Sequence, residues 1–298
     1  MFKNLLVPLD GSQLAESVIP VAVSLALKLS SHVTLLHIIE QDAPSEVHND
    51  RHLTSVEEAQ AYLDQIQNAS FKPLSIPVDI HVHEDPEANV SRSIIEHASD
   101  EFKPDLIILC SHGKSGIRNL LFGNIAQQVL AASGIPVLVI KPGDSPTRFD
   151  LQQILLPLDN ESNHEQALPY AEALSRAYHA HLTLLCVVPT LGTDSGPHAA
   201  AGALLPGTAS AYLEMAEEIA NEHFDRHVKD LHSSGIEASS QVSRGDPAAT
   251  ITEQAITLHS DLIIFGTHGH AGLGAFWKRS VAATVAAKTQ IPLLLIPL

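Results

Sequence analysis

Two glycine-containing segments have the residue types that hold a phosphate group. Residues 110–116 read Cys-Ser-His-Gly-Lys-Ser-Gly, and residues 266–272 read Gly-Thr-His-Gly-His-Ala-Gly. Glycines let backbone amides approach phosphate oxygens, and a helix that follows adds a favourable dipole. Each half of the chain also carries an aspartate directly after its first apolar run, Asp10 and Asp159. Such a carboxylate could contact a Mg²⁺ ion.

Two better-known phosphate motifs are excluded by single residues. Residues 113–115 read Gly-Lys-Ser like the end of a P-loop, but Ile108 stands where that motif needs its first glycine. Residues 272–274 begin like a dinucleotide fingerprint, but Trp277 takes the place of the third glycine. We therefore expect neither a P-loop nor an NAD site.

The chain has 18 histidines, and two pairs have metal-ligand character. His81 and His83 are two apart on a predicted strand and so face the same side, and His268 and His270 share one loop. No third ligand stands at a recognisable spacing, so we interpret both pairs as surface or loop histidines, with opportunistic metal binding as the alternative.

The remaining reactive residues do not form a catalytic set. No nucleophile, base and orienting acid stand at a spacing that supports covalent catalysis, so the sequence favours no dedicated enzyme. Cys110 precedes a predicted helix and is a candidate redox-responsive thiol, whereas Cys186 lies in an apolar run and is expected to be inert. Two distant cysteines do not form a disulfide framework, which favours the reducing cytoplasm.

An internal repeat positions these residues. Residues 4–12, NLLVPLDGS, return as QILLPLDNE at 153–161, an offset of 149, and the DLII of residues 105–108 returns at 261–264, an offset of 156. The second copy therefore holds about seven extra residues in its middle. We predict two duplicated domains, residues 1–143 and 150–298, with a linker at about 144–149.

Each copy alternates short apolar runs with helical stretches. This alternation predicts two tandem α/β domains, each a doubly wound five-stranded parallel sheet of Rossmann-like type. Strands are expected at residues 5–9, 33–39, 78–83, 106–109 and 137–140 and, in the second copy, ending at Leu158, Val188, Ser243, Phe265 and Ile296. Helices are expected at residues 13–30, 55–69, 87–99 and 125–132.

Local signals refine these elements. Ser55 with Glu58, and Ser162 with Glu165, have the spacing of a capping box at a helix start. Residues 190–207 are rich in Gly, Ala and Pro and are expected to form a mobile loop. Ligands of such sheets bind outside the carboxyl ends of the strands, where the strand order reverses.

Charge and hydropathy limit the partners. The chain has 17 Lys and Arg against 34 Asp and Glu, a formal net charge of −17, which argues against general nucleic-acid binding. Hydrophobic residues make up 45% of the chain, enough for sizeable cores, but no run of about 18 apolar residues occurs. The first ten residues lack the features of a signal peptide. We expect a cytoplasmic protein that binds neither nucleic acid nor a membrane.

The sequence resembles the universal stress protein family in its tandem form, once per half and over essentially the whole chain. The resemblance rests on the VPLD-type first strand, the LLH-type second strand and the Ser/Thr-His-Gly loop. ATP-binding members carry G-x2-G-x9-G-[ST], and neither copy completes this motif. The first copy has Cys110 at its first glycine and Asn124 at its hydroxyl position, and the second has Arg279 at its third glycine.

The resemblance implies ATP, with Mg²⁺, as the cofactor and gives the residues that would bind it. Asp10 and the backbone of Ile38 would hold the adenine end, and the first copy keeps the glycine at the helix start, which makes it the better site. The first copy supplies Pro8, Asp10, Ile38, Cys110, His112, Gly113, Gly123, Asn124 and Ile125. The second copy supplies Asp159, Val187, Gly266, Gly269, Ser280 and Val281.

Three functions follow from the resemblance. The first is a stress-response protein that binds ATP or a related adenine nucleotide as a nucleotide-responsive regulatory module. The second is a scaffold whose nucleotide sites have decayed, and the third is a slow ATPase. The apolar last strands, at residues 137–140 and 293–296, are expected to pair within the chain as a pseudo-dimer. A further homodimer and an unknown protein partner are also expected.

Overall fold

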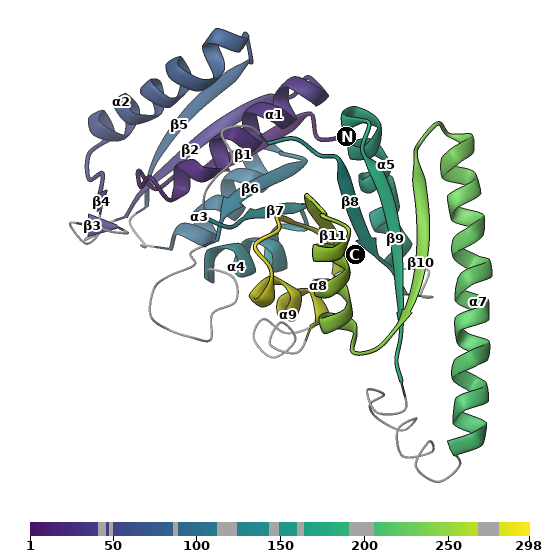
Figure 1. Ribbon diagram of the computed structural model, residues 1–298. Coiled ribbons are helices and arrows are strands. Elements are labelled where there is room, and N and C mark those ends of the chain that lie inside the picture. The colour runs from purple at the N-terminus through teal and green to yellow at the C-terminus, as the bar shows by residue number, and fades with distance from the viewer. Residues whose placement is uncertain are drawn as a thin grey trace. The chain divides into compact units, whose positions relative to one another are not determined.

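The computed structural model (Figure 1) divides the chain into two compact units. It describes residues 1–40, 46–47, 50–85, 89–111, 124–142, 149–159, 164–190, 206–267 and 280–298. Unit 1 comprises the described residues of Met1–Asp150 together with Pro292–Pro297. Unit 2 comprises those of Leu151–Thr267 together with residues 280–291 and Leu298.

Unit 1 is built on a sheet with the strand order β12-β7-β6-β1-β2-β5. The pairs β7–β6, β6–β1, β1–β2 and β2–β5 are parallel, as predicted. The central residues of β1, β2, β6 and β7 are buried, as expected for strands covered on both faces, whereas those of β5 are half-buried. The strands are β1 (Asn4–Pro8), β2 (His32–Glu40), β5 (Val78–Asp85), β6 (Leu106–Cys110), β7 (Val137–Ile140) and β12 (Leu293–Pro297). Two unexpected two-residue strands, β3 (Glu46–Val47) and β4 (Asp50–Arg51), pair with each other.

Helices cover both faces of this sheet. The chain runs from β1 to β2 to β5 in one direction and then returns to β6 on the other side of β1. Right-handed crossovers therefore place α1 and α2 on one face and α3 and α4 on the other. The helices are α1 (Ile19–Leu29), α2 (Val56–Ile66), α3 (Val90–His97) and α4 (Asn124–Ser133). The 3-10 helix η1 (Ala15–Val18) precedes α1, and the π-helical segments η2 (Gln67–Phe71) and η4 (Ala98–Phe102) follow α2 and α3. A 3-10 helix, η3 (Lys72–Leu74), continues from η2.

The helix starts have local causes. The Ser55 hydroxyl accepts a hydrogen bond from the Glu58 amide at 3.2 Å, so the predicted capping residue begins α2. The carboxylate of Glu58 accepts from the Thr54 amide instead of the Ser55 amide, at 3.5 Å. The predicted helix 13–30 is divided, because Pro20 sits in the first turn of α1 and η1 precedes it.

Unit 2 repeats the arrangement around parallel strands in the order β10-β9-β8-β11. The strands are β8 (Gln153–Pro157), β9 (His181–Val188), β10 (Ala238–Arg244) and β11 (Leu262–Thr267). The helical elements are η5 (His164–Ala167), α5 (Leu168–Tyr178), α7 (Pro206–Ser233), α8 (Pro247–Thr257) and α9 (Val281–Lys288). The helix α7 has 28 residues and is the long green helix of Figure 1.

In unit 2, the predicted capping box does not mark the start of α5, and most of the predicted loop lies outside the described residues. The expected capping pair does not begin α5, because Glu165 lies in the preceding turn η5 and the helix starts at Leu168 with Pro169 in its first turn. Ser162 lies outside the described residues, as do residues 191–205 of the loop expected at 190–207.

The last strands of the two repeats pair with each other, as predicted. β12 lies antiparallel to β7, with Leu293 opposite Val139 and Leu295 opposite Val137. All four residues of β7 are buried, so the partner strand covers an apolar edge that would otherwise invite aggregation. In the described part of the chain, no helix combines the length and the apolar character needed to cross a membrane.

Candidate functional site

The strand order of unit 1 reverses between β1 and β6, where a doubly wound sheet binds its ligand. Asp10 follows β1, and Cys110 is the last residue of β6. The two predicted site residues lie close enough for the charge of Asp10 to act on the Cys110 thiol. The hydroxyl of Ser17 donates a hydrogen bond to the Cys110 sulfur at 3.3 Å and joins β6 to η1.

A tight turn fixes the Asp10 carboxylate. Its Oδ1 accepts hydrogen bonds from the amide of Ser12 at 2.9 Å and from the hydroxyl of Ser12 at 2.6 Å. Ser12 is fully buried. Between them Gly11 has φ +88°, and a Cβ there would come within 2.9 Å of the Leu53 side chain. The turn therefore needs both an acceptor side chain at position 10 and glycine at position 11.

The other strand residues predicted for this site lie beside Asp10. Pro8 ends β1, and the buried Ile38 lies in β2, paired with His83 of β5. His37, next to Ile38, is fully buried, and its Nδ1 lies 2.8 Å from the carbonyl oxygen of Leu9. Burial lowers the pKa of His37, and the Leu9 contact opposes this shift. His37 is therefore a neutral ring that connects β2 to the end of β1 through its contact with Leu9.

The surroundings of Cys110 argue against the redox interpretation of this thiol. Burial raises the pKa of this thiol to about 11, and the hydrogen bond from Ser17 opposes the rise only in part. A reactive cysteine needs the opposite shift, because the thiolate is the nucleophile. The pKa of Cys186 is likewise raised to about 11 by burial, which fits the inert core role predicted for it.

Several predicted phosphate ligands lie outside the described residues: His112, Gly113, Gly123 and Gly269. Asn124 is the first residue of α4, and Ile125 follows it half-buried. In unit 2 the hydroxyl of Ser280 accepts from the Ala283 amide at 3.1 Å and so caps α9 directly before Val281. Ser280 thus has a structural role that needs no nucleotide.

The remaining predicted residues of unit 2 surround the end of β8. Asp159 follows this strand, and its charge acts on the Cys186 thiol of β9. Val187 pairs with Ser243 of β10. Gly266 lies in β11, where a Cβ would come within 2.9 Å of the Leu298 side chain.

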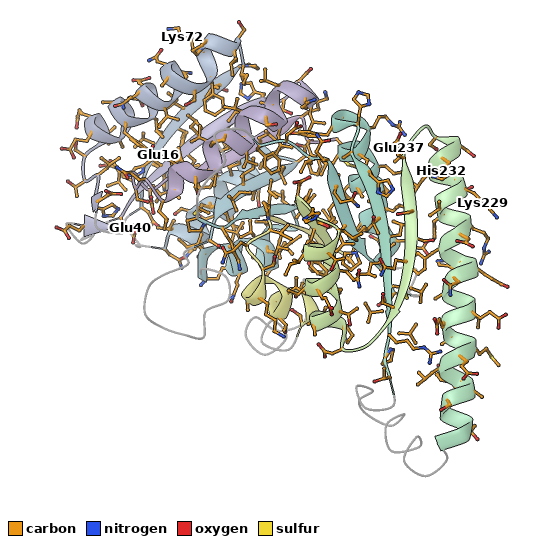
Figure 2. The ribbon with its side chains drawn as sticks, in the orientation of Figure 1. Glu16, Glu40, Lys72, Lys229, His232 and Glu237 are labelled. Carbon is orange, nitrogen blue, oxygen red and sulfur yellow. The ribbon has the colours of Figure 1, made fainter. Side chains whose placement is uncertain are left out.

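Sequence reasoning missed a carboxylate shared by the two repeats at an offset of 149. Glu16 lies in η1 (labelled in Figure 2), and its pKa is raised by burial, against the effect of the Tyr62 hydroxyl on α2 and with a smaller contribution from Asp50. Its counterpart Glu165 lies in η5 and faces His223 of α7, with 3.0 Å between Oε1 and Nε2. The sequence signal that could have revealed these histidines was the spacing of His223 and His227, four residues apart on one helix face.

The structure also completes one predicted histidine pair. His97 of α3 lies against His81 and His83 of β5, with ring centroids 4.9 and 4.4 Å apart. Sequence spacing did not reveal His97 as a third nitrogen beside this pair, because the crossover from β5 brings α3 back over its own strand. Burial lowers the pKa of His81, opposed by Glu101 and reinforced by His97 and His83. The pair His268 and His270 lies outside the described residues.

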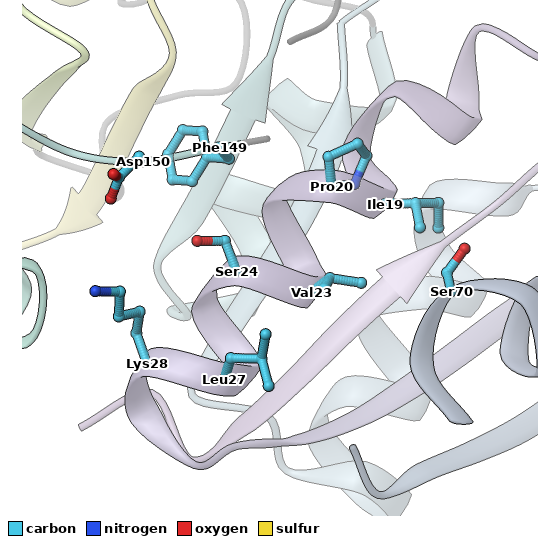
Figure 3. Close-up of a pocket in the computed structure, with 9 residues that line it drawn as sticks. All are labelled: Ile19, Pro20, Val23, Ser24, Leu27, Lys28, Ser70, Phe149 and Asp150. Carbon is cyan, nitrogen blue, oxygen red and sulfur yellow. The ribbon is translucent and has the colours of Figure 1, made fainter. Parts of the chain in front are cut away.

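A groove of about 440 Å³ lies elsewhere, along the outer face of α1 (Figure 3). Its position on the helix flank, away from Asp10 and Cys110, separates it from the predicted site. The lining residues are Ile19, Pro20, Val23, Ser24, Leu27, Lys28, Ser70, Phe149 and Asp150.

Comparison with known proteins gives the family. The model of the universal stress protein family matches residues 1–141 and again residues 151–297. Universal stress protein MJ0577 of Methanocaldococcus jannaschii is 27% identical over 168 residues, which cover 49% of this chain and 98% of that protein.

Two solved structures share the fold over 99% of this chain, each at 17% identity. They are a putative universal stress protein of Pseudomonas aeruginosa, with a TM-score of 0.68 and 93% of that chain covered, and a universal stress protein of Archaeoglobus fulgidus, with 0.65 and 96%. With the family model matched twice along the sequence, the chain belongs to the universal stress protein family, in tandem form.

Proposed function

We propose that this protein binds ATP or a related adenine nucleotide at the carboxyl ends of β1 and β6 in unit 1. The observation that carries the proposal is Asp10, held by the Ser12 turn at the reversal of strand order and next to Cys110. The segment that follows Cys110 in sequence contains the glycines expected to meet the phosphates. The adenine end would contact Asp10 and the backbone of Ile38.

The residues around Asp10 are compatible with a polyanion. Cys110 replaces the first glycine of the family motif, but its raised pKa keeps the thiol neutral, so it adds bulk without negative charge. A fully ionised cysteine at this position would repel a phosphate. When bound, the nucleotide would bring Mg²⁺ to balance its charge. Asp10, at the end of β1, would orient the nucleotide.

Unit 2 is the poorer candidate for the same ligand. Arg279 stands where the family motif has its third glycine, and a side chain there obstructs the approach of phosphate to the helix start. The hydroxyl of Ser280 is already used to cap α9.

The proposed role is a nucleotide-responsive binding module of the stress response, acting in the cytoplasm. Nucleotide binding would order the segment after Cys110 and change the surface that a partner protein recognises. The rival role is a scaffold that binds no nucleotide. Slow ATP hydrolysis could accompany binding.

Matched variants in the two repeats test the assignment. Asp10→Asn keeps the acceptor oxygen that the Ser12 turn needs and removes the charge, and Asp159→Asn makes the same change in unit 2. We expect Asp10→Asn to weaken ATP binding about tenfold or more, the effect of losing a charged hydrogen-bond partner, while Asp159→Asn binds as the wild type does. Isothermal titration calorimetry measures both. Equal affinities of Asp10→Asn and wild type would refute the site, and an absence of heat and of thermal shift in all three chains would favour the scaffold.

A further inference from the structure

Three metal-ligating side chains converge in unit 2 from two separate elements. Glu165 comes from η5, and His223 and His227 lie one turn apart on the same face of α7. The Oε1 of Glu165 lies 3.0 Å from Nε2 of His223 and 3.6 Å from Nε2 of His227. The two Nε2 atoms are 3.2 Å apart.

We propose that Glu165, His223 and His227 bind a divalent transition-metal ion of the Zn²⁺ type. A triangle with sides of 3.0, 3.2 and 3.6 Å has its centre about 1.9 Å from each corner. Zn²⁺ binds imidazole nitrogen at about 2.0–2.1 Å and carboxylate oxygen at about 2.0–2.2 Å. An ion placed just out of the plane of the three atoms can therefore lie at these distances from all of them.

Hydrogen bonds alone leave this arrangement incomplete. A neutral imidazole whose Nε2 donates to Glu165 has no lone pair on that nitrogen to accept from the other ring. If His223 donates to Glu165, His227 is left with a contact of 3.6 Å to the carboxylate, which is too long for a hydrogen bond. A cation removes the conflict, because all three atoms then act as electron-pair donors.

The surroundings allow an ion to enter and hold the ligands in place. The side chains of Glu165, His223 and His227 are 31%, 28% and 19% exposed, so solvent reaches the cluster. Phe224, which is buried, contacts both rings from the same helix, at centroid distances of 5.4 and 6.3 Å. Three protein ligands leave the fourth tetrahedral position for water or an external ligand.

The first repeat supplies a natural comparison. The buried Ala59 and Leu63 of α2 correspond to the buried Ala220 and Phe224 of α7. In this alignment Tyr62 takes the position of His223, and Ile66 takes the position of His227. Glu16 corresponds to Glu165. The carboxylate is common to both repeats, and the nitrogen donors are found in the second alone. Tyrosine and isoleucine are therefore residues that these two helix positions accept.

The experiment titrates Zn²⁺ into the full chain, made without a histidine tag and stripped with a chelator. Isothermal titration calorimetry and native mass spectrometry give the affinity and the number of ions per chain. The test variant is His223→Tyr with His227→Ile, the pair that the first repeat carries. The control is His232→Gln on the same helix (labelled in Figure 2), since the Nε2 of His232 is 2.8 Å from the Ala238 carbonyl oxygen and is not one of the three converging atoms.

We expect the double variant to lose one bound Zn²⁺ per chain and the control to keep it. Ions held by His81, His83 and His97 would remain in both chains, so they do not hide the loss. Equal Zn²⁺ uptake by the wild type and the double variant would overturn the proposal.

A second measurement uses only the wild-type chain and so does not depend on a variant that folds. Zn²⁺ should protect His223 and His227 from diethylpyrocarbonate, as mapped by peptide mass spectrometry, while the exposed His179 reacts equally with and without the ion. Unchanged modification of His223 and His227 would also overturn the site.

Discussion

At the scale of single residues, the two repeats use the same backbone positions for different chemistry. His37 of β2 corresponds to Cys186 of β9, and Cys110 of β6 corresponds to Gly266 of β11. The sequence predicted that Asp10 and Cys110 lie at the ligand-binding edge of the sheet, because residues that end parallel strands meet there. It did not predict the pKa of Cys110, which depends on burial by residues far away in the chain.

His37 should make stability depend on pH. Its folded-state pKa is lowered below the ordinary 6.5, so the unfolded chain takes up this proton first as the pH falls. The stabilising effect of the neutral ring is complete above pH 6.5 and is lost progressively as the pH falls below that value. The variant His37→Cys, which copies the second repeat, lacks this contribution.

Urea unfolding at pH 7.5 and pH 5.5 measures the effect of His37. The wild type should lose more free energy of unfolding between the two pH values than His37→Cys does. The other histidines are common to both chains and cancel in the comparison. Parallel losses in the two chains would show that the His37 pKa is not lowered.

The cysteines should be slow to react in the folded protein. With pKa values of about 11, Cys110 and Cys186 hold about a hundredfold less thiolate at pH 7.5 than an unperturbed thiol of pKa 9.0. A colorimetric disulfide reagent should therefore label both thiols slowly in buffer and rapidly in denaturant. Fast labelling of Cys110 in buffer would restore the redox interpretation.

At the scale of elements, local signals predicted the types of element well and their ends less well. The alternation of apolar runs gave the parallel strands of both repeats, and Ser55 marked the start of α2. The position of Glu165 was not predictable from its capping-box spacing, because its side chain contacts α7, which lies 58 residues further along the chain. Contacts of that range depend on the complete fold.

The turn after β1 should tolerate no side chain at position 11. Alanine at Gly11 must adopt φ +88° and place a Cβ 2.9 Å from Leu53, so Gly11→Ala should lower the free energy of unfolding by about 2 kcal/mol. The control Gly207→Ala, where nothing lies within 4 Å, should change it by less than about 0.5 kcal/mol. Denaturant titrations of the two variants give the comparison, and equal stabilities would mean that the turn relaxes without cost.

At the scale of the whole chain, duplication explains both what was predictable and what was not. The offsets of 149 and 156 gave the tandem arrangement, and the apolar last strands gave the pairing of β7 with β12. The Glu165 cluster was hidden because the insertion in the second copy and the length of α7 break the register between the repeats. On the two proposals made above, the copies of one fold would hold different ligands, a nucleotide in unit 1 and a metal ion in unit 2.

The number of ATP molecules bound per chain tests the proposed nucleotide site of unit 1. Equilibrium dialysis of the full chain against ATP and Mg²⁺ measures this number without a variant. We expect one ATP per chain at saturation, displaced from the chain by other adenine nucleotides. No bound ATP at millimolar concentration would contradict it and leave the scaffold as the function of this protein.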